Sequence, residues 1–230
     1  MSRVYVLSEG PTEQALILDV LAPPLSKHSI YLIPKLLGAP GHKGGIRRFA
    51  AVEREISNLL RQESAVYVTT LFDRYGLPGD WPGLAESKAA RDINAAHRAL
   101  CQAMGERIEE IMGSEFRAER FIPHIQFYEI EAFLFVSPSE TARILGDPSK
   151  SKILRQIRDG HETCEHINDG VNTAPSKRIT SIFPSYSYKK GRTLNAHLWR
   201  VCAEIGVPEL RKSCRLFDGW ISKLEALGPA

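Results

Sequence analysis

The sequence has 230 residues, of which 43% are hydrophobic and 25% are charged, as is ordinary for a soluble globular protein. It shows no apolar run long enough to span a membrane and no secretory signal peptide, so we expect a cytoplasmic protein. The formal net charge of +3 conceals an asymmetry: residues 1–149 carry 16 Lys and Arg against 19 Asp and Glu, whereas residues 150–230 carry 14 against 8. An acidic first part and a basic second part suit a metal site beside a surface that binds a polyanion.

The first 136 residues alternate between strand-like and helical segments. Apolar runs predict strands over residues 3–7, 30–37, 65–72 and 120–128. Helical periodicity between them predicts helices over residues 11–25, 46–60 and 85–112. The repeated strand–helix order favours an α/β fold in which a mostly parallel sheet carries helices on both faces.

From residue 137 onward the sequence contains no convincing strand. Short amphipathic helices are expected over residues 152–160, 196–206 and 214–227, separated by Pro and Gly. We therefore expect an α/β domain over residues 1–136 and a basic α-helical lobe over residues 137–230 that packs on it. Four widely spaced cysteines are expected to be free thiols; they are Cys101, Cys164, Cys202 and Cys214.

Acidic residues follow three of the expected strands. In "SEGPTEQ", Glu9 follows the first strand and Glu13 lies in the first turn of the next helix, Asp73 ends the third strand, and "FIPHIQFYEIEAFLF" ends on Glu129 and Glu131. The carboxyl ends of parallel strands meet at the edge where ligands bind. A single acid there could be a solvated loop residue or complement a helix dipole. Several carboxylates at one edge repel one another, so a divalent cation, Mg²⁺ or Mn²⁺ for all-oxygen ligands, explains the set better.

These acidic motifs also carry a family resemblance. "SEGPTEQ" after the first strand, with Asp at the end of the third, resembles the Toprim fold of topoisomerases, primases and OLD-type nucleases. Together with "TLFDRYGLPGDWPG", "FIPHIQFYEIEAFLF" and "INDGVNTAPSKRI", nearly the whole chain resembles an uncharacterised bacterial Toprim-like family, domain of unknown function 4276. Some members of that family resemble components of phage-defence operons that encode a partner ATPase.

The resemblance implies roles for particular residues. Glu9 matches a metal ligand or general acid-base, and Glu13 and Asp73 match metal ligands. The sequence departs at Tyr75, where Toprim proteins carry a second Asp. Glu129 or Glu131 is expected to replace that ligand, with a slight preference for Glu129, and whether one or two metals bind is left open.

A basic motif in the second half suits a phosphate group. In "NDGVNTAPSKRI" we expect Ser176 to be the N-cap of a helix whose first turn carries Lys177 and Arg178, so that backbone N–H groups and cations point together. Asn168 and Asp169 are expected to orient this loop. An ordinary capped surface helix is the alternative, and the family resemblance favours the functional interpretation.

Two further basic segments are candidates for nucleic-acid contacts, although a solvated basic turn is the commoner explanation for the one over residues 186–192. "GHKGGIRRF" lacks the spacing of a P-loop, so ATP binding is not expected there. "YSYKKGR" interleaves Tyr186 and Tyr188 with cations, which suits single-stranded nucleic acid. The cations of the two segments are Lys43, Arg47, Arg48, Lys189, Lys190 and Arg192.

The remaining candidates are weaker. "HETCEH" has no second pair of ligands, so a zinc site is not expected there. Trp81 and Trp220 are expected to be packing residues rather than base-stacking ones.

The leading hypothesis from the sequence is a Toprim-like nuclease that depends on Mg²⁺ or Mn²⁺ and cleaves DNA or RNA. Glu9 would take part in catalysis, and Lys177 and Arg178 would neutralise the charge of the phosphate. A rival is a non-catalytic Toprim-like subunit, disabled by Tyr75, that binds a partner ATPase and nucleic acid. Nucleotidyl transfer is a third hypothesis, but no nucleotide-binding feature of the sequence supports it. Strandedness, sequence preference and oligomeric state are left open.

Overall fold

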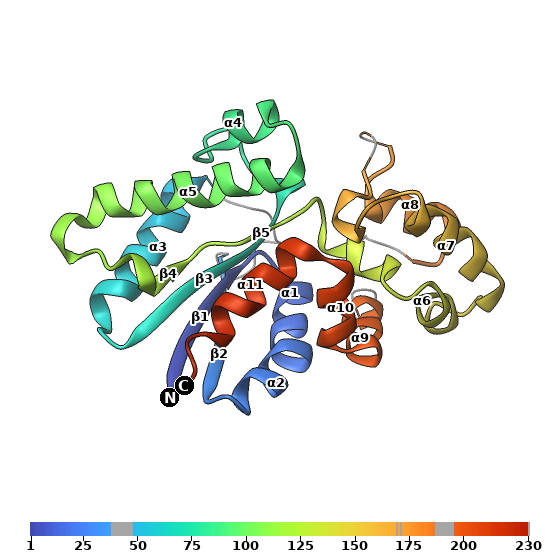
Figure 1. Ribbon diagram of the computed structural model, residues 1–230, viewed down its shortest axis with the longest axis horizontal. Helices are drawn as coiled ribbons and strands as arrows, with labels where there is room; N and C mark the ends of the chain where they lie inside the picture. The colour runs from blue at the N-terminus through green and yellow to red at the C-terminus, as the bar shows by residue number, and fades with distance from the viewer. Residues whose placement is uncertain (38–47, 169, 171, 187–195, 230) are drawn as a thin grey trace.

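A parallel sheet forms the centre of the molecule. The computed structural model describes residues 1–37, 48–168, 170, 172–186 and 196–229 (Figure 1). Among these residues, five strands form one sheet in the order β2-β1-β3-β4, with β5 also paired to β3, and each pairing is parallel. The strands are β1 Ser2–Ser8, β2 Ile30–Leu36, β3 Val66–Asp73, β4 Phe121–Ile122 and β5 Ile125–Gln126. The predicted mostly parallel sheet is confirmed.

Helices cover both faces of the sheet, as predicted (Figure 1). Val4 and Val6 of β1 face one hydrophobic cluster, and Leu7 belongs to a second cluster on the other face. Strands buried on both faces read as continuous apolar runs, which is why these segments were recognisable in the sequence. The first cluster includes residues of a π-helical segment, Leu16–Leu21, and of α2 Ala22–Ser26 and α11 Arg215–Glu225; the second includes residues of α3 Phe49–Gln62, α4 Leu84–Ala89 and α5 Ile93–Met112.

Two of the predicted helices differ in detail. The helix expected over 11–25 begins as α1 Pro11–Ala15, widens into the π-helical segment and ends with α2. Pro23 and Pro24 have no N–H, so carbonyls one turn before them lose their usual donors. The single helix expected over 85–112 is wrong, because Asp92 is extended and accepts a hydrogen bond from the Ala95 N–H at 2.7 Å. Asp92 thereby caps a new helix, α5, and separates it from α4.

The strand expected over 120–128 is also wrong as one strand. Pro123 separates β4 from β5, because proline cannot donate to a ladder hydrogen bond. Thr70 of β3 bridges the gap: its hydroxyl donates to the His124 carbonyl at 2.8 Å and accepts from the His124 N–H at 2.9 Å. The chain then leaves the sheet and forms a 3-10 helix over Ile130–Phe135.

The C-terminal third is helical, as predicted. Its last helix, α11, lies on the sheet, where the Trp220 indole N–H donates to Thr69 Oγ1 at 2.8 Å and the indole stacks on His124 with ring centroids 4.6 Å apart. The two ends of the chain lie side by side (Figure 1), and Ser2 Oγ donates to the Leu227 carbonyl at 2.6 Å. The division into domains at residue 136 stays a prediction. The helices before α11 are α6 Pro138–Ile144, α7 Ser151–Asp159, α8 Pro175–Ile182, α9 Ala196–Ile205 and α10 Val207–Ser213.

Three further features concern the length of the helices, the two tryptophans and the cysteines. None of the described helices is both long and apolar enough to cross a membrane. Trp81 and Trp220 are 3% and 2% exposed, which confirms that they are packing residues. The four cysteines are free thiols, also as predicted.

Candidate metal centre

The carboxyl ends of β1 and β3 lie next to each other, at the edge of the sheet that faces the helical lobe (Figure 1). The connection after β1 leads to β2 on one side, and the connection after β3 leads to β4 on the other side. α/β sheets bind ligands at such a point, where the strand order reverses. Glu9 follows β1 and Asp73 ends β3. Glu9 Oε1 accepts a hydrogen bond from the Asp73 N–H at 3.2 Å, so the two predicted acids do converge. We call this region the acidic edge; its carboxylates are those of Glu9, Glu13, Asp73, Glu129 and Glu131.

The 3-10 helix that follows β5 is tied to the acidic edge by Asp73. Asp73 Oδ1 accepts a hydrogen bond from the Ile130 N–H at 2.9 Å. Glu129 therefore lies at the start of this helix and Glu131 within it. The expectation that they end a strand is wrong, but this turn still brings them to the edge.

Glu129 is held by the helical lobe. Its carboxylate accepts hydrogen bonds from the Ser176 N–H at 2.8 Å and from the Ser176 hydroxyl at 3.0 Å. The prediction that Ser176 is the N-cap of α8 is wrong: Ala174 is the N-cap, because Pro175 takes the first helical position and Ser176 the second. The α8 N-terminus, where the sequence predicted a phosphate, binds a carboxylate of the same chain.

Burial and mutual repulsion raise the pKa values at the acidic edge. Burial, followed by the charge of Glu13, raises the pKa of Glu9 to about 7, although a hydrogen bond from the Asp73 N–H opposes the shift. Burial, followed by the charge of Glu129, raises the pKa of Glu131 to about 8. Burial also raises the pKa of Glu13. Near neutral pH these groups therefore share protons or need a positive partner.

Asp73 lies at the centre of the acidic edge. Burial is the main cause that raises its pKa well above the usual range, and the remaining causes are the charges of four other carboxylates, Glu131, Glu13, Glu9 and Glu129 in that order. The other four predicted carboxylates thus all lie within electrostatic reach of Asp73. Such a set is characteristic of functional sites, because a structural role alone seldom needs so many buried acids together.

Two buried oxygens at this edge fit the prediction of a hard cation. Glu131 is 4% exposed, and its Oε2 has no hydrogen-bond partner among the described residues; the Ser8 hydroxyl, at the end of β1, is buried and lacks one in the same part of the chain. Oxygen donors of this kind suit Mg²⁺ or Mn²⁺. Within the described residues, no three Asp, Glu, His or Cys side chains stand as a ready metal shell. Glu9, Asp73 and Glu129 instead accept hydrogen bonds from N–H groups of their own chain.

Tyr75 lies at the rim of the acidic edge. Its hydroxyl donates to Asn168 Oδ1 at 2.6 Å, and its ring centroid is 5.4 Å from that of Tyr128. Asn168 Oδ1 also accepts from the Gly170 N–H at 3.3 Å, so Asn168 does orient its loop, as the sequence suggested. The position where the family resemblance led us to expect an acid thus carries a phenol, whose hydroxyl contacts Asn168.

Arg74 is a further residue near the acidic edge, and the sequence patterns did not point to it. This half-buried side chain donates through Nε to Ser87 Oγ at 3.1 Å, and its Cζ lies 5.9 Å from the centre of the Phe127 ring. Burial lowers its pKa, the charges of Tyr128 and Tyr75 oppose that shift, and no salt bridge joins Arg74 to a described carboxylate. Its place directly after Asp73 was the signal that could have found it.

The basic candidates have different outcomes. Lys177 is exposed in the first turn of α8, whereas Arg178 Nε donates to the Thr173 carbonyl at 2.8 Å. Arg48 is exposed just before α3. Tyr186 is 4% exposed, so the expectation that it offers a stacking surface is wrong; it fills the core instead. The candidates that lie outside the described residues are Lys43, Arg47, Asp169, Tyr188, Lys189, Lys190 and Arg192.

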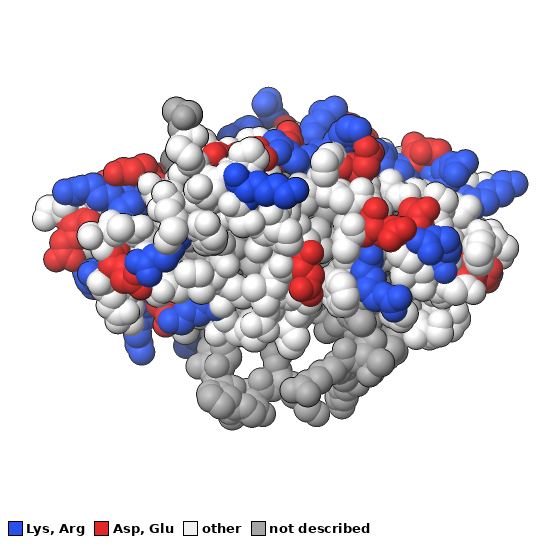
Figure 2. Space-filling model, turned by 90° about the horizontal axis from the view of Figure 1, so that it is seen from below, with Lys and Arg blue, Asp and Glu red and all other residues white. Residues whose placement is uncertain are grey.

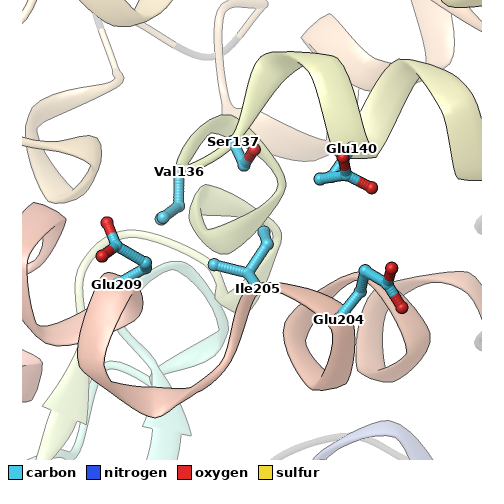
Figure 3. Close-up of a pocket in the computed structure, with 6 residues that line it drawn as sticks. All are labelled: Val136, Ser137, Glu140, Glu204, Ile205 and Glu209. Carbon is cyan, nitrogen blue, oxygen red and sulfur yellow. The ribbon is translucent and has the colours of Figure 1, made fainter.

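A cavity of about 430 Å³ lies in the helical lobe, away from the acidic edge, between the start of α6 and the α9–α10 junction. Figure 3 shows two of its carboxylates, Glu140 and Glu204, on the same side of the cavity. Both pair with Arg143, at 2.7 and 3.0 Å. The third, Glu209, pairs with Lys212 at 2.5 Å. Because these charges already have partners, we do not assign a cation to this cavity.

The face in Figure 2 lies at the end of the molecule where the two chain termini meet. Positive and negative side chains are intermixed there around a largely uncharged centre. The part of this face that the structure describes therefore shows no continuous basic surface.

Comparison with known proteins gives one match. A family model described as a domain of unknown function, DUF4276, matches residues 8–225. No curated protein and no solved structure matches the chain. The matched range includes every carboxylate of the acidic edge and also α8 and α11, and it begins at the last residue of β1.

Proposed function

The chain belongs to the DUF4276 family, and we propose that it is a divalent-metal-dependent phosphodiesterase, related to Toprim nucleases, that cleaves nucleic acid. The observation that carries the proposal is the gathering of five carboxylates at one sheet edge, two of them with pKa values raised to about 7 and about 8. A polyanionic substrate would meet strong repulsion at such an edge without a cation. Mg²⁺ or Mn²⁺ bound there makes both the burial of the acids and the approach of a phosphate favourable.

The residues divide into those that would bind the metal and those that would act on the substrate. Glu13, Asp73 and Glu131 are suited to hold Mg²⁺ or Mn²⁺, which when bound would activate water and stabilise charge on the phosphate. Glu9, whose pKa is raised to about 7, is suited to accept a proton near neutral pH. Lys177 is exposed on the neighbouring helix and is suited to neutralise a phosphate of the substrate.

Metal binding and cleavage should be tested together. Calorimetry with Mn²⁺ and nicking of supercoiled plasmid in Mg²⁺, Mn²⁺ or EDTA would be compared for the wild type, Glu9→Ala and Glu131→Gln. We expect metal-dependent nicking that Glu9→Ala abolishes and metal affinity that Glu131→Gln reduces at least tenfold. Glu109→Gln, which changes an exposed acid of α5, is the matched control and should behave like the wild type. A folded wild type that binds no Mn²⁺ at millimolar concentration would contradict the proposal.

Tyr75 favours one second candidate, a non-catalytic subunit that binds nucleic acid and a partner ATPase. A phenol is a poor metal ligand at neutral pH, and the hydroxyl of Tyr75 already contacts Asn168. This candidate predicts metal-independent binding of nucleic acid without nicking under any metal condition. The plasmid assay therefore separates the two candidates directly.

A further inference from the structure

We propose that Tyr75 and Tyr128 form a stacking platform for an unpaired base of single-stranded nucleic acid, and that Arg74 binds a phosphate beside it. The inference deepens the proposed function and rests on it for the identity of the ligand. It names single-stranded nucleic acid, or a frayed end, as the substrate class.

The exposure of Tyr75 is the first observation. Its side chain is 40% exposed although the residue is anchored from two sides. The hydroxyl donates to Asn168 Oδ1 at 2.6 Å, and the backbone N–H donates to the Tyr128 carbonyl at 3.2 Å. A ring that is fixed in position yet open to solvent loses little conformational entropy when a flat ligand stacks on it.

The second observation is the aromatic neighbourhood. The rings of Tyr75 and Tyr128 are 5.4 Å apart and tilted by 37°, and the Tyr128 ring is 5.4 Å from that of Phe127. Phe127 is buried, Tyr128 is half-buried and Tyr75 is exposed, so the series leads from the core to the surface. Proteins that bind single strands use such rings because every base presents a π-face.

Arg74 supplies the third observation. Its guanidinium is half-buried, and its described contacts are the Ser87 hydroxyl and the face of Phe127. A guanidinium that is partly withdrawn from water, with no acidic partner among the described residues, suits a phosphate better than a solvated surface cation does.

These groups lie within reach of one nucleotide chain. The charges of Glu129 and Arg74 both act on the Tyr75 hydroxyl, so Tyr75 lies near both the acidic edge and Arg74. A base stacked on Tyr75 would have one flanking phosphate toward Arg74 and the other toward the acidic edge. A base in a duplex is already stacked and paired, so only an unpaired one can use the ring.

Binding without metal tests the platform. Fluorescence anisotropy in EDTA, at fixed salt, would compare labelled dodecathymidine with an abasic oligomer of the same length, which keeps the phosphates but has no bases. We expect the wild type to prefer the thymidine strand by about tenfold, the effect of stacking one base. Tyr75→Ala should abolish this preference, and Tyr75→Phe should retain it because the ring remains. Arg74→Gln should weaken both strands equally.

Tyr31→Ala is the matched control, because Tyr31 is 43% exposed and lies on β2, a strand that does not pair with β3. It should keep the wild-type preference. If Tyr75→Ala is folded by its melting curve and still prefers thymidine strands as the wild type does, the platform is wrong. A wild type without any preference overturns it too. These outcomes are independent of plasmid nicking: nicking without base preference overturns the platform alone, whereas base preference without nicking supports the platform and contradicts the nuclease.

Discussion

Glu129 and Glu131 are two residues apart, yet their surroundings differ. Glu129 accepts two hydrogen bonds from Ser176, whereas Glu131 Oε2 is buried and has no hydrogen-bond partner in the described part of the chain. A carboxylate oxygen buried without a donor is costly unless a cation or a proton accompanies it. This contrast favours Glu131 as the ligand that compensates for Tyr75, and it reverses the slight preference for Glu129 drawn from the sequence.

The raised pKa values predict how metal binding depends on pH. Glu131, with a pKa of about 8, must lose its proton before it can bind a cation, and the charge that Glu9 gains with a pKa of about 7 adds to the attraction for that cation. Mn²⁺ affinity should therefore rise between about pH 6 and pH 9, with release of protons that calorimetry in buffers of different ionisation enthalpy detects. Glu131→Gln should bind Mn²⁺ more weakly, and its Mn²⁺ affinity should stop rising at a lower pH than that of the wild type. An affinity that is constant across this range would show that neither group takes part.

Lys177 and Arg178 are neighbours with different expected roles. Lys177→Ala should weaken nucleic-acid binding and reduce the slope of log K against log salt by roughly 0.7–0.9, the contribution of one phosphate contact, with Mn²⁺ affinity unchanged. Arg178→Ala should mainly lower stability, because its Nε holds the Thr173 carbonyl. The control is Lys212→Ala, an exposed lysine that pairs with Glu209. If Lys177→Ala keeps the wild-type salt slope, the phosphate contact lies elsewhere.

At the scale of the element, the predicted bounds of helices and strands were wrong where a single polar or proline residue interrupts a segment. β1, β2 and β3 were predicted to within one or two residues, because buried parallel strands are continuous apolar runs. Asp92 and Pro123 interrupt segments that are otherwise periodic: Asp92 caps the start of a new helix, and Pro123 ends the short strand β4.

The candidate site was predictable only in part, for a related reason. Glu9 and Asp73 could be expected to meet, because both follow parallel strands. The contact between Glu129 and Ser176 joins residues 47 positions apart, and the position of Glu131 depends on the 3-10 helix. Neither leaves a periodic signal in the sequence, so both required the structure.

The packing of the start of α4 against α5 gives a prediction at the scale of the element. Gly83 has φ +73°, and a Cβ there would lie 2.5 Å from the Ala99 carbonyl oxygen on α5. Gly83→Ala should therefore destabilise the protein by about 2 kcal/mol or more in urea unfolding, from strain and overpacking.

Gly105 is the matched control for that substitution. It lies within α5, and a Cβ there would meet nothing within 4 Å. Gly105→Ala should stabilise the protein by about 0.5–1 kcal/mol through helix propensity. Equal effects of the two substitutions would mean that α4 does not pack on α5 as described.

At the scale of the whole molecule, buried polar groups connect the lobe to the sheet. Glu165, fully buried in a 3-10 turn of the lobe, accepts hydrogen bonds from the Leu216 and Phe217 N–H groups at 2.9 Å and so caps α11. α11 in turn packs on the sheet through Trp220, which stacks on the fully buried His124. His124 Nδ1 lies 3.3 Å from His97 Nε2 on α5. One chain of contacts thus runs from the lobe through the sheet to the opposite layer.

The ionisable groups of this chain give the last prediction. Burial raises the pKa of Glu165 from 4.5 to about 7, so its contribution to stability is present below pH 4.5 and is lost as the pH rises through 7. Burial lowers the pKa of His97 from 6.5 to about 4, so its contribution is present above pH 6.5 and is lost as the pH falls through 4. The free energy of unfolding in urea should therefore fall less for Glu165→Gln than for the wild type as the pH rises from 5 to 8, and the two falls should differ by up to about 3 kcal/mol. For His97→Asn the free energy of unfolding should fall less than for the wild type as the pH falls from 6.5 to 4, and not at higher pH. Parallel curves for the wild type and both variants would show that these groups are not buried as the fold requires.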